Sequence, residues 1–164
     1  DRIFDLLIRD WSEEALARSR GVVEELCGSG ELTGHGERDG RRIRIVRGDA
    51  FSAESLAEIG TGIDIAIVSG LFELFPENDV VRRTLSGLAA ALRPGGRLVY
   101  TNQPWHPQLL MIAETLDNRD GKPWVMRRRT QAEMDQLVRQ SGFNKSRTLV
   151  DNFGIFTVST AVRG

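Results

Sequence analysis

This sequence of 164 residues has little cysteine and histidine: one cysteine and two histidines. The single cysteine, Cys27, excludes a disulfide within the chain and a zinc site built from several cysteines. No group of histidines and carboxylates has the spacing of metal ligands, so we expect no metal site. Long apolar runs are also missing, since none approaches the roughly 20 residues that a membrane-spanning helix needs. Without a signal-peptide layout at its start, the sequence predicts a soluble, cytoplasmic protein with no membrane span.

Charge of one sign is not in excess, because 22 Lys and Arg face 23 Asp and Glu, for a formal net charge of −1. The chain thus lacks the overall positive field that dominates nucleic-acid binding, and we expect no nucleic-acid partner. Arginines do gather locally, at 38–47 and at 127–129. Such clusters suit an anionic ligand, for example a phospholipid head group or a phosphorylated metabolite, but a solvated and charge-balanced surface also explains them. Both alternatives stay open.

Strand-like and helix-like segments alternate along the chain. Strands are expected over 4–9, 43–46, 63–68, 97–101, 146–150 and 155–162. Helices, with their capping residues, are expected over 12–26, 52–59, 80–92, 109–116 and 130–141. Pro94-Gly95-Gly96 is expected to end the third helix, and 31–40 to form a loop. This order predicts one α/β domain over 1–164, a three-layer sandwich whose mostly parallel sheet ends in a C-terminal antiparallel hairpin.

Two of the expected strands end in a carboxylate, Asp10 and Asp49. Ligands bind such sheets outside the carboxyl ends of the strands, where an acidic side chain can accept both hydroxyls of a ribose. A second acidic side chain after the next strand could accept the amine of an adenine. The alternative is that each aspartate only caps the turn or helix that follows it.

These strand ends resemble those of a known family. Three segments are similar to motifs of the class I methyltransferases that use S-adenosylmethionine. They are residues 10–12 before a helix, residues 48–50 after the next strand, and Leu-Arg-Pro-Gly-Gly-Arg-Leu at 92–98. The resemblance covers nearly the whole chain and implies a Rossmann-like sheet. It also implies methyl transfer from S-adenosylmethionine to an unidentified small-molecule or lipid-like acceptor. Segments 101–107 and 124–134 resemble, more loosely, bacterial methyltransferases that occur within larger polypeptides, in some cases beside a hydrolase domain, which implies a further domain in a longer parent chain.

The resemblance implies that seven residues at the strand ends bind the cofactor: Asp10, Trp11, Asp49, Ala50, Phe51, Ser69 and Gly70. Asp10 would bind the ribose hydroxyls, and Trp11 would lie against the adenine or the ribose, although an aromatic residue here can also pack on the rim of the sheet. Asp49 would meet the adenine amine, and the backbone of the next two residues would meet the adenine edge. Ser69 and Gly70 would pass beneath the methionine part of the cofactor.

The acceptor side is expected just beyond the fourth strand. Gln103, Trp105 and Trp124 could form its pocket, because aromatic side chains are common in such linings. His106 is a candidate general base for an acceptor that must lose a proton, but it could equally cap the helix at Pro107. No other catalytic residue is apparent in the sequence.

One element of the family pattern is absent. The glycine-rich loop of these methyltransferases follows a strand that precedes the one ending at Asp10, whereas Gly28-Ser29-Gly30 follows a helix. We therefore expect the domain to be incomplete at its N-terminus. A non-catalytic Rossmann-like binding module stays an alternative. An NAD(P)-binding oxidoreductase domain is a weaker one, because Tyr100 is not part of a Tyr-x-x-x-Lys pair.

Overall fold

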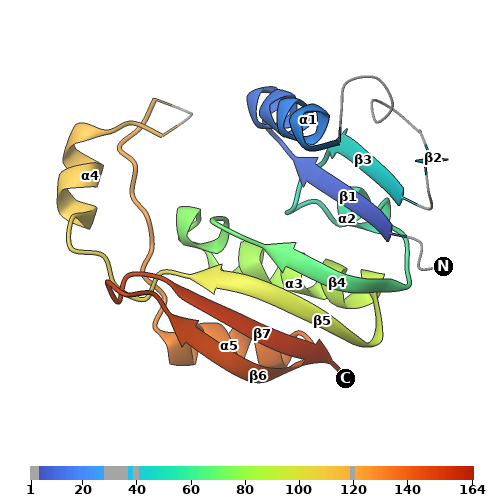
Figure 1. Cartoon of the computed structure of the whole chain (residues 1–164). Helices are drawn as coiled ribbons and strands as arrows, with labels where there is room; N and C mark the ends of the chain where they lie inside the picture. The colour runs from blue at the N-terminus through green and yellow to red at the C-terminus, as the bar shows by residue number, and fades with distance from the viewer. Residues whose placement is uncertain (1–3, 28–36, 39–40, 119–120) are drawn as a thin grey trace. The chain divides into compact units, whose positions relative to one another are not determined.

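The computed structural model describes residues 4–27, 37–38, 41–118 and 121–164 (Figure 1). The chain forms two compact units, Asp1–Ser55 and Leu56–Gly164. Each unit contains a β-sheet with helices packed against it, which confirms the α/β class. None of the described helices is long and apolar enough to cross a membrane.

The first unit is built on two parallel strands, β1 (Phe4–Asp10) and β3 (Arg41–Arg47). A two-residue strand, β2 (Glu37–Arg38), pairs antiparallel with β3, which corrects the expectation of a loop throughout 31–40. Helix α1 (Glu13–Cys27) contacts both parallel strands and buries Leu16 and Val23. The short helix α2 (Ala53–Ala57) crosses the boundary between the units.

The second unit contains a four-stranded sheet in the order β4-β5-β7-β6. Strands β4 (Ile63–Val68) and β5 (Leu92–Asn102) are parallel, and β6 (Phe143–Val150) and β7 (Thr157–Arg163) form the expected antiparallel hairpin. Helices α3 (Asn78–Ala91) and α5 (Gln131–Gln140) contact each other and lie on one face of the sheet (Figure 1). A 3₁₀ turn, η1 (Phe72–Leu74), follows β4, and α4 (Leu109–Thr115) follows β5.

The core of the second unit lies between this sheet and its two helices. Alternate residues of β5, including Leu98 and Tyr100, point into it, as a strand with one buried face requires. Apolar residues at helical spacing on α3 and α5 complete it: Val81, Leu85, Leu88, Met134, Leu137 and Val138. On the other face of β4, Ile65 and Ile67 are 55% and 72% exposed.

The Pro-Gly-Gly segment differs from its expected role, because α3 ends three residues before Pro94, at Ala91. Leu92 already has extended backbone and pairs with Ile63, as the first residue of β5. The residue that precedes a proline is disfavoured in the helical region, so the helix ends early. Pro94 to Gly96 then form an irregularity within β5, with Gly95 at a φ of +74°, and regular pairing resumes at Arg97.

Candidate functional site

The carboxyl ends of β1 and β3 lie side by side in the first unit. Asp10 pairs in register with Arg47, and the backbone N–H of Gly48 donates to the Asp10 carbonyl at 3.0 Å. Asp49 follows one residue later. The two aspartates that the sequence singles out are therefore brought to the same edge of one parallel strand pair, the edge at which such sheets bind ligands.

Each aspartate uses one carboxylate oxygen locally. Asp10 Oδ1 accepts from the backbone N–H of Ser12 at 2.7 Å, and Asp49 Oδ1 accepts from that of Phe51 at 2.8 Å. These bonds fulfil the turn-capping alternative. Neither Oδ2 atom has a hydrogen bond to a residue that the structure describes, so each carboxylate keeps one acceptor oxygen. Capping and ligand binding are therefore compatible at both positions.

The turn that carries Asp49 is held by the side chain of Arg9. Its guanidinium donates to the carbonyl oxygen of Ser55 at 2.7 Å and to the hydroxyl of Ser55 at 2.8 Å, and that hydroxyl accepts from the backbone N–H of Asp49 at 3.0 Å. The guanidinium lies over Gly48, where an added Cβ would come within 2.4 Å of Arg9 Nε. Glycine at 48 thus allows the close approach that links the end of β3 to the start of α2.

Trp11 is half-exposed, and the guanidinium of Arg47 stacks on its ring at 4.3 Å from the centroid. This cation–π contact holds the indole against the end of β3, at the edge of the sheet where β1 ends. Of the other residues assigned to the cofactor here, Ala50 and Phe51 form the turn after Asp49 and are partly buried, and the Phe51 N–H already donates to Asp49.

In the second unit, Ser69 and Gly70 follow β4 and are exposed. Gly70 has a φ of +67°, a conformation that residues with a Cβ rarely adopt, and its N–H donates to Thr101 Oγ1 at 2.8 Å. This bond ties the end of β4 to the end of its parallel neighbour β5. Gly28 to Gly30 lie outside the described residues.

The residues expected at the acceptor differ widely in exposure. Gln103 is buried, Trp105 is half-exposed and Trp124 is partly buried. His106 Nδ1 accepts from the backbone N–H of Gln108 at 3.1 Å. Because Nδ1 is thereby the accepting nitrogen, the neutral imidazole carries its proton on Nε2, and His106 could act as a base only after this bond breaks. The bond closes a turn immediately before α4, whose N-cap residue, Gln108, makes no side-chain capping hydrogen bond, so the general-base and capping roles of His106 both stay predictions.

A buried polar cluster at the carboxyl end of β5 was not foreseen from the sequence. Arg129 is only 1% exposed, and its guanidinium donates to the carbonyls of Phe72 and Phe75 and to Asn78 Oδ1, at 2.6, 2.8 and 2.8 Å. Its own carbonyl accepts from Asn102 Nδ2 at 3.0 Å. Burial lowers the pKa of Arg129. This arginine is therefore neither a solvated charge nor a ligand for a large anion; it holds η1 against the end of the sheet.

Glu73, on η1, is the acidic member of this cluster. Its carboxylate is 5% exposed, and Oε2 has no hydrogen-bond partner among the described residues. Burial raises the pKa of Glu73, while the charge of Arg129 works in the opposite direction. Only the position of Glu73 five residues after the end of β4, near the expected ligand-binding end of that strand, could have drawn attention to it.

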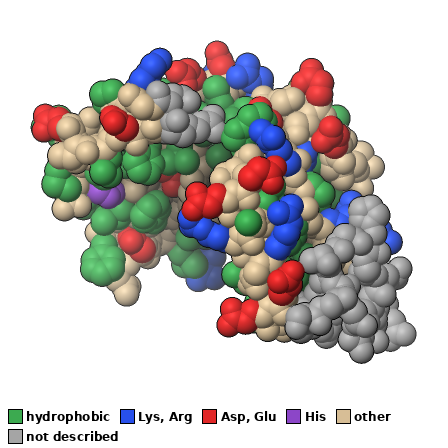
Figure 2. Space-filling model, turned by 90° about the horizontal axis from the view of Figure 1, so that it is seen from above, with side chains coloured by type: hydrophobic (Ala, Val, Ile, Leu, Met, Phe, Trp, Pro, Cys, Tyr) green, Lys and Arg blue, Asp and Glu red, His purple; other side chains and the backbone are tan. Residues whose placement is uncertain are grey.

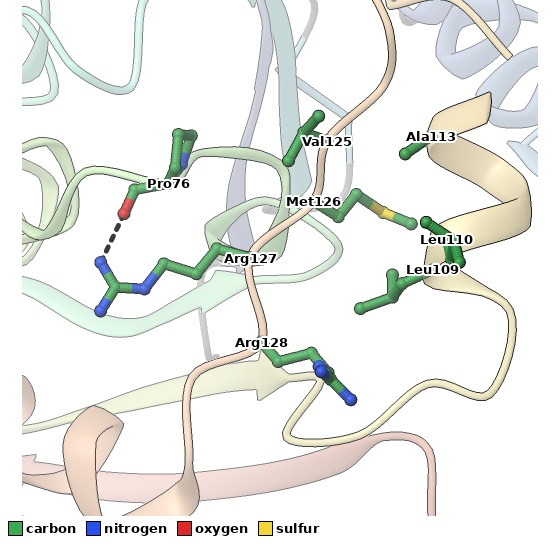
Figure 3. Close-up of a pocket in the computed structure, with 8 residues that line it drawn as sticks. All are labelled: Pro76, Leu109, Leu110, Ala113, Val125, Met126, Arg127 and Arg128. Atoms are coloured by element: carbon green, nitrogen blue, oxygen red, sulfur yellow. Dashed lines mark hydrogen bonds between the residues drawn. The ribbon is translucent and has the colours of Figure 1, made fainter.

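A pocket of about 520 Å³ lies between α4, Pro76 and the extended segment 125–128 (Figure 3). Six of its eight lining residues are apolar: Pro76, Leu109, Leu110, Ala113, Val125 and Met126. The other two are Arg127 and Arg128. None of the residues of α4 is fully buried, and Figure 2 shows hydrophobic side chains gathered at the α4 end of the molecule. No group of three or more potential metal ligands occurs among the residues that the structure describes.

Comparison with known proteins assigns the family. A family described as "Putative methyltransferase" matches residues 1–163. The chain belongs to this methyltransferase family. One similar protein is the uncharacterized protein YnbC of Escherichia coli K12, which is 50% identical over 162 residues. The match covers 98% of this chain and 26% of YnbC, so the chain spans about a quarter of the length of that relative.

Solved structures of methyltransferases share the fold at low identity. The magnesium protoporphyrin IX methyltransferase of Synechocystis PCC 6803, solved with bound SAH, has a TM-score of 0.66 and 18% identity, over 96% of this chain and 63% of that one. A SAM-dependent methyltransferase of Methanosarcina mazei has a TM-score of 0.63 and 16% identity, over 98% of this chain and 82% of that one. These likenesses confirm the Rossmann-like methyltransferase fold.

Proposed function

We propose that this methyltransferase-family chain binds S-adenosylmethionine and takes part in methyl transfer to a small-molecule or lipid-like acceptor. The observation that carries the proposal is the pair Asp10 and Asp49, at the carboxyl ends of adjacent parallel strands, each with one carboxylate oxygen left to accept. Solved methyltransferases of the same fold, one with bound SAH, support it.

The residues of the first unit fit the adenosine half of this cofactor. Asp10 Oδ2 would accept from the ribose hydroxyls, Trp11 would present the exposed part of its ring, and Asp49 Oδ2 would accept from the adenine amine. Two fixed acceptors and a flat apolar surface are the polar and apolar elements that a nucleoside site needs. The assignment of Ser69 and Gly70 to the methionine part stays a prediction.

When bound, the cofactor would supply a methyl carbon open to attack by an acceptor lone pair, with its sulfur as the leaving group that keeps the electrons of the carbon–sulfur bond. This chain's contribution would be to hold the cofactor and orient the acceptor, since in-line displacement gains most from positioning. A base is needed only for an acceptor that loses a proton. His106 would have to release Gln108 to serve as that base.

We further propose that the glycine-rich loop of this domain is supplied by another part of a longer polypeptide. The 26% coverage of YnbC supports the existence of such a parent chain. Full-length protein should then bind SAH more tightly than residues 1–164 do. Equal affinities of the two proteins would contradict this part of the proposal.

The cofactor proposal is tested by thermal unfolding with SAM, SAH and NAD. At ten times its dissociation constant, a ligand that binds only the folded state stabilises it by about 1.4 kcal/mol. For a chain of this size that is a rise of about 3–6 °C in the melting temperature. A rise with NAD alone would favour an oxidoreductase domain, and a rise with SAH but no methyl transfer by the full-length protein would favour a non-catalytic binding module.

The role of Asp10 is tested by Asp10→Asn, whose amide oxygen can still accept from the Ser12 N–H. We expect about tenfold weaker SAH binding, because a charged acceptor of the ribose hydroxyls is lost. Asp5→Asn is the matched control, since Asp5 lies on the same strand and pairs with Arg44 at 3.3 Å. Equal affinities of the two variants for SAH would refute the ribose role of Asp10.

A further inference from the structure

The three consecutive arginines at 127–129 differ in what they contact. They lie on a segment without regular secondary structure between α4 and α5, and Arg127 and Arg128 point to opposite sides of it (Figure 3). Arg129 is buried on η1 and Asn78, and Arg127 donates to the Pro76 carbonyl at 2.6 Å and pairs with Glu133. Arg128, between them, is exposed and points to the side on which α4 lies (Figure 3).

Among the described residues, Arg128 is the cation of this segment for which no partner is found. It has no hydrogen bond or ion pair to any residue within the described parts of the chain. The guanidinium groups of its two neighbours, by contrast, donate to carbonyl, amide and carboxylate oxygens. It lines the pocket together with Met126, Leu109 and Leu110 (Figure 3). The pocket thus combines an apolar wall with one unneutralised positive charge.

This composition selects a class of ligand. An apolar wall of leucine, methionine, valine and proline side chains offers few hydrogen-bond groups, so it suits a hydrocarbon or ring body and not a sugar. A guanidinium matches the planar oxygens of a carboxylate or a phosphate, which it can bind with two hydrogen bonds. The pocket has a volume of about 520 Å³ and is largely open to solvent.

We propose that this pocket binds the apolar body of an amphipathic anion, with Arg128 holding its carboxylate or phosphate. The statement rests on the proposed function in one respect: the bound molecule would be the methyl acceptor. Binding itself needs no cofactor and can be measured alone. A soluble phosphate ester and a bilayer lipid share this chemistry, and the experiment separates them.

The test is calorimetric titration of the chain, without SAM or SAH, with decyl phosphate below its micelle concentration. Inorganic phosphate tests the head group alone, and decylammonium tests the same tail with the opposite charge. We expect decyl phosphate to bind at least about tenfold more tightly than either. Flotation with phosphatidylglycerol vesicles tests whether the ligand is a lipid within a bilayer. Flotation that Arg128→Gln abolishes would support the proposal with a lipid as ligand.

Two variants locate the site. Arg128→Gln should weaken decyl phosphate binding about tenfold, because it removes a charge-assisted hydrogen bond. Leu110→Glu places a carboxylate in the pocket at a residue that is 72% exposed, so it should weaken binding without unfolding the protein. Arg83→Gln, at an exposed arginine of α3 that does not line the pocket, is the matched control and should bind as the unmodified chain does.

Equal affinity of Arg128→Gln and Arg83→Gln for decyl phosphate would overturn the proposal, as would equal binding of decyl phosphate and decylammonium. Attachment to vesicles that Arg128→Gln leaves unchanged, without binding of monomeric decyl phosphate, would also overturn it. The cofactor is titrated separately. If decyl phosphate binding depends on Arg128 but the chain does not bind SAH, the pocket would still be a site for an amphipathic anion. The proposed methyl transfer would then be refuted for this chain.

Discussion

Replacing Arg129 by methionine should destabilise the second unit far more than the same change at Arg128. Arg129 is 1% exposed, and its guanidinium satisfies the carbonyls of Phe72 and Phe75 and the side-chain oxygen of Asn78. Methionine has a comparable length and no donor. The variant therefore leaves three acceptors without their hydrogen-bond donor in the interior.

The magnitude follows from these three acceptors. Leaving a buried acceptor unsatisfied costs about 1–3 kcal/mol, and hydrogen bonds from a charged donor lie toward the upper end. Burial also lowers the pKa of Arg129, so the charged side chain carries a desolvation penalty that methionine does not. The variant removes this desolvation penalty, which offsets part of the cost of the three lost hydrogen bonds. We therefore expect Arg129→Met to lower the free energy of unfolding by about 3 kcal/mol. Proteins of this kind have about 5–15 kcal/mol in total, so the variant should still fold.

Urea unfolding, followed by far-ultraviolet circular dichroism, measures the difference. Arg128→Met is the control, because the exposed neighbour makes no hydrogen bond to a described residue, and its cost should stay within about 0.5 kcal/mol. Arg129→Lys should fall between the two variants, since one ammonium cannot reach all three acceptors in the geometry of a guanidinium. A free energy of unfolding for Arg129→Met equal to that of Arg128→Met would refute the assignment of Arg129 as the residue that holds η1.

Three further predictions concern stability and titration. Burial raises the pKa of Glu73 above 4.5, so the folded state holds the carboxyl proton more tightly than the unfolded state does. The contribution of Glu73 to the free energy of unfolding therefore falls as the pH rises above 4.5. Glu73→Gln should remove this pH dependence in urea unfolding, whereas the exposed Glu114→Gln should not. Burial raises the pKa of Tyr100 to about 12 from 10.0, so the tyrosinate absorbance of this only tyrosine should stay absent from the folded protein at pH 10, and a native midpoint near 10 would contradict the prediction. A Cβ at Gly96 would lie 2.8 Å from the Arg93 carbonyl oxygen and 3.1 Å from that of Ile63, so Gly96→Ala should cost about 2 kcal/mol in thermal unfolding, and a melting temperature equal to that of the unmodified chain would contradict this.

The elements whose signals are local could be predicted from the sequence. The strand at 63–68 is rich in isoleucine and valine and has turn residues on both sides, and the structure places β4 at the same residues. The Thr130 hydroxyl accepts from the Glu133 N–H at 3.1 Å, as its capping box predicts. The carboxylate of Glu133 does not complete that box, because it binds Asn78 and Arg127 instead. Partners outside the helix thus replace the local one.

The arginine cluster shows why the rest could not be predicted. Three identical neighbours have the same local signal, and only what lies on each side of the segment separates a buried structural guanidinium from an exposed one. The Pro-Gly-Gly segment is a similar case, because pairing of Leu92 with Ile63 decides where β5 begins. Both outcomes depend on contacts across the sheet that no sequence window contains.

The aspartates at the strand ends illustrate a different limit. Capping and cofactor binding each explain an acidic residue after a strand, and they use different oxygen atoms of one side chain. Asp10 Oδ1 closes the turn onto Ser12, and closing it fixes the direction of Oδ2. The cap thereby pre-organises the acceptor that the ribose would use. Asp10→Ala should consequently lose both stability and SAH affinity, whereas Asp10→Asn should lose mainly affinity, because its amide oxygen can keep the cap. If both variants lost stability equally and neither lost affinity in SAH titrations of the full-length protein, Asp10 would serve the turn alone.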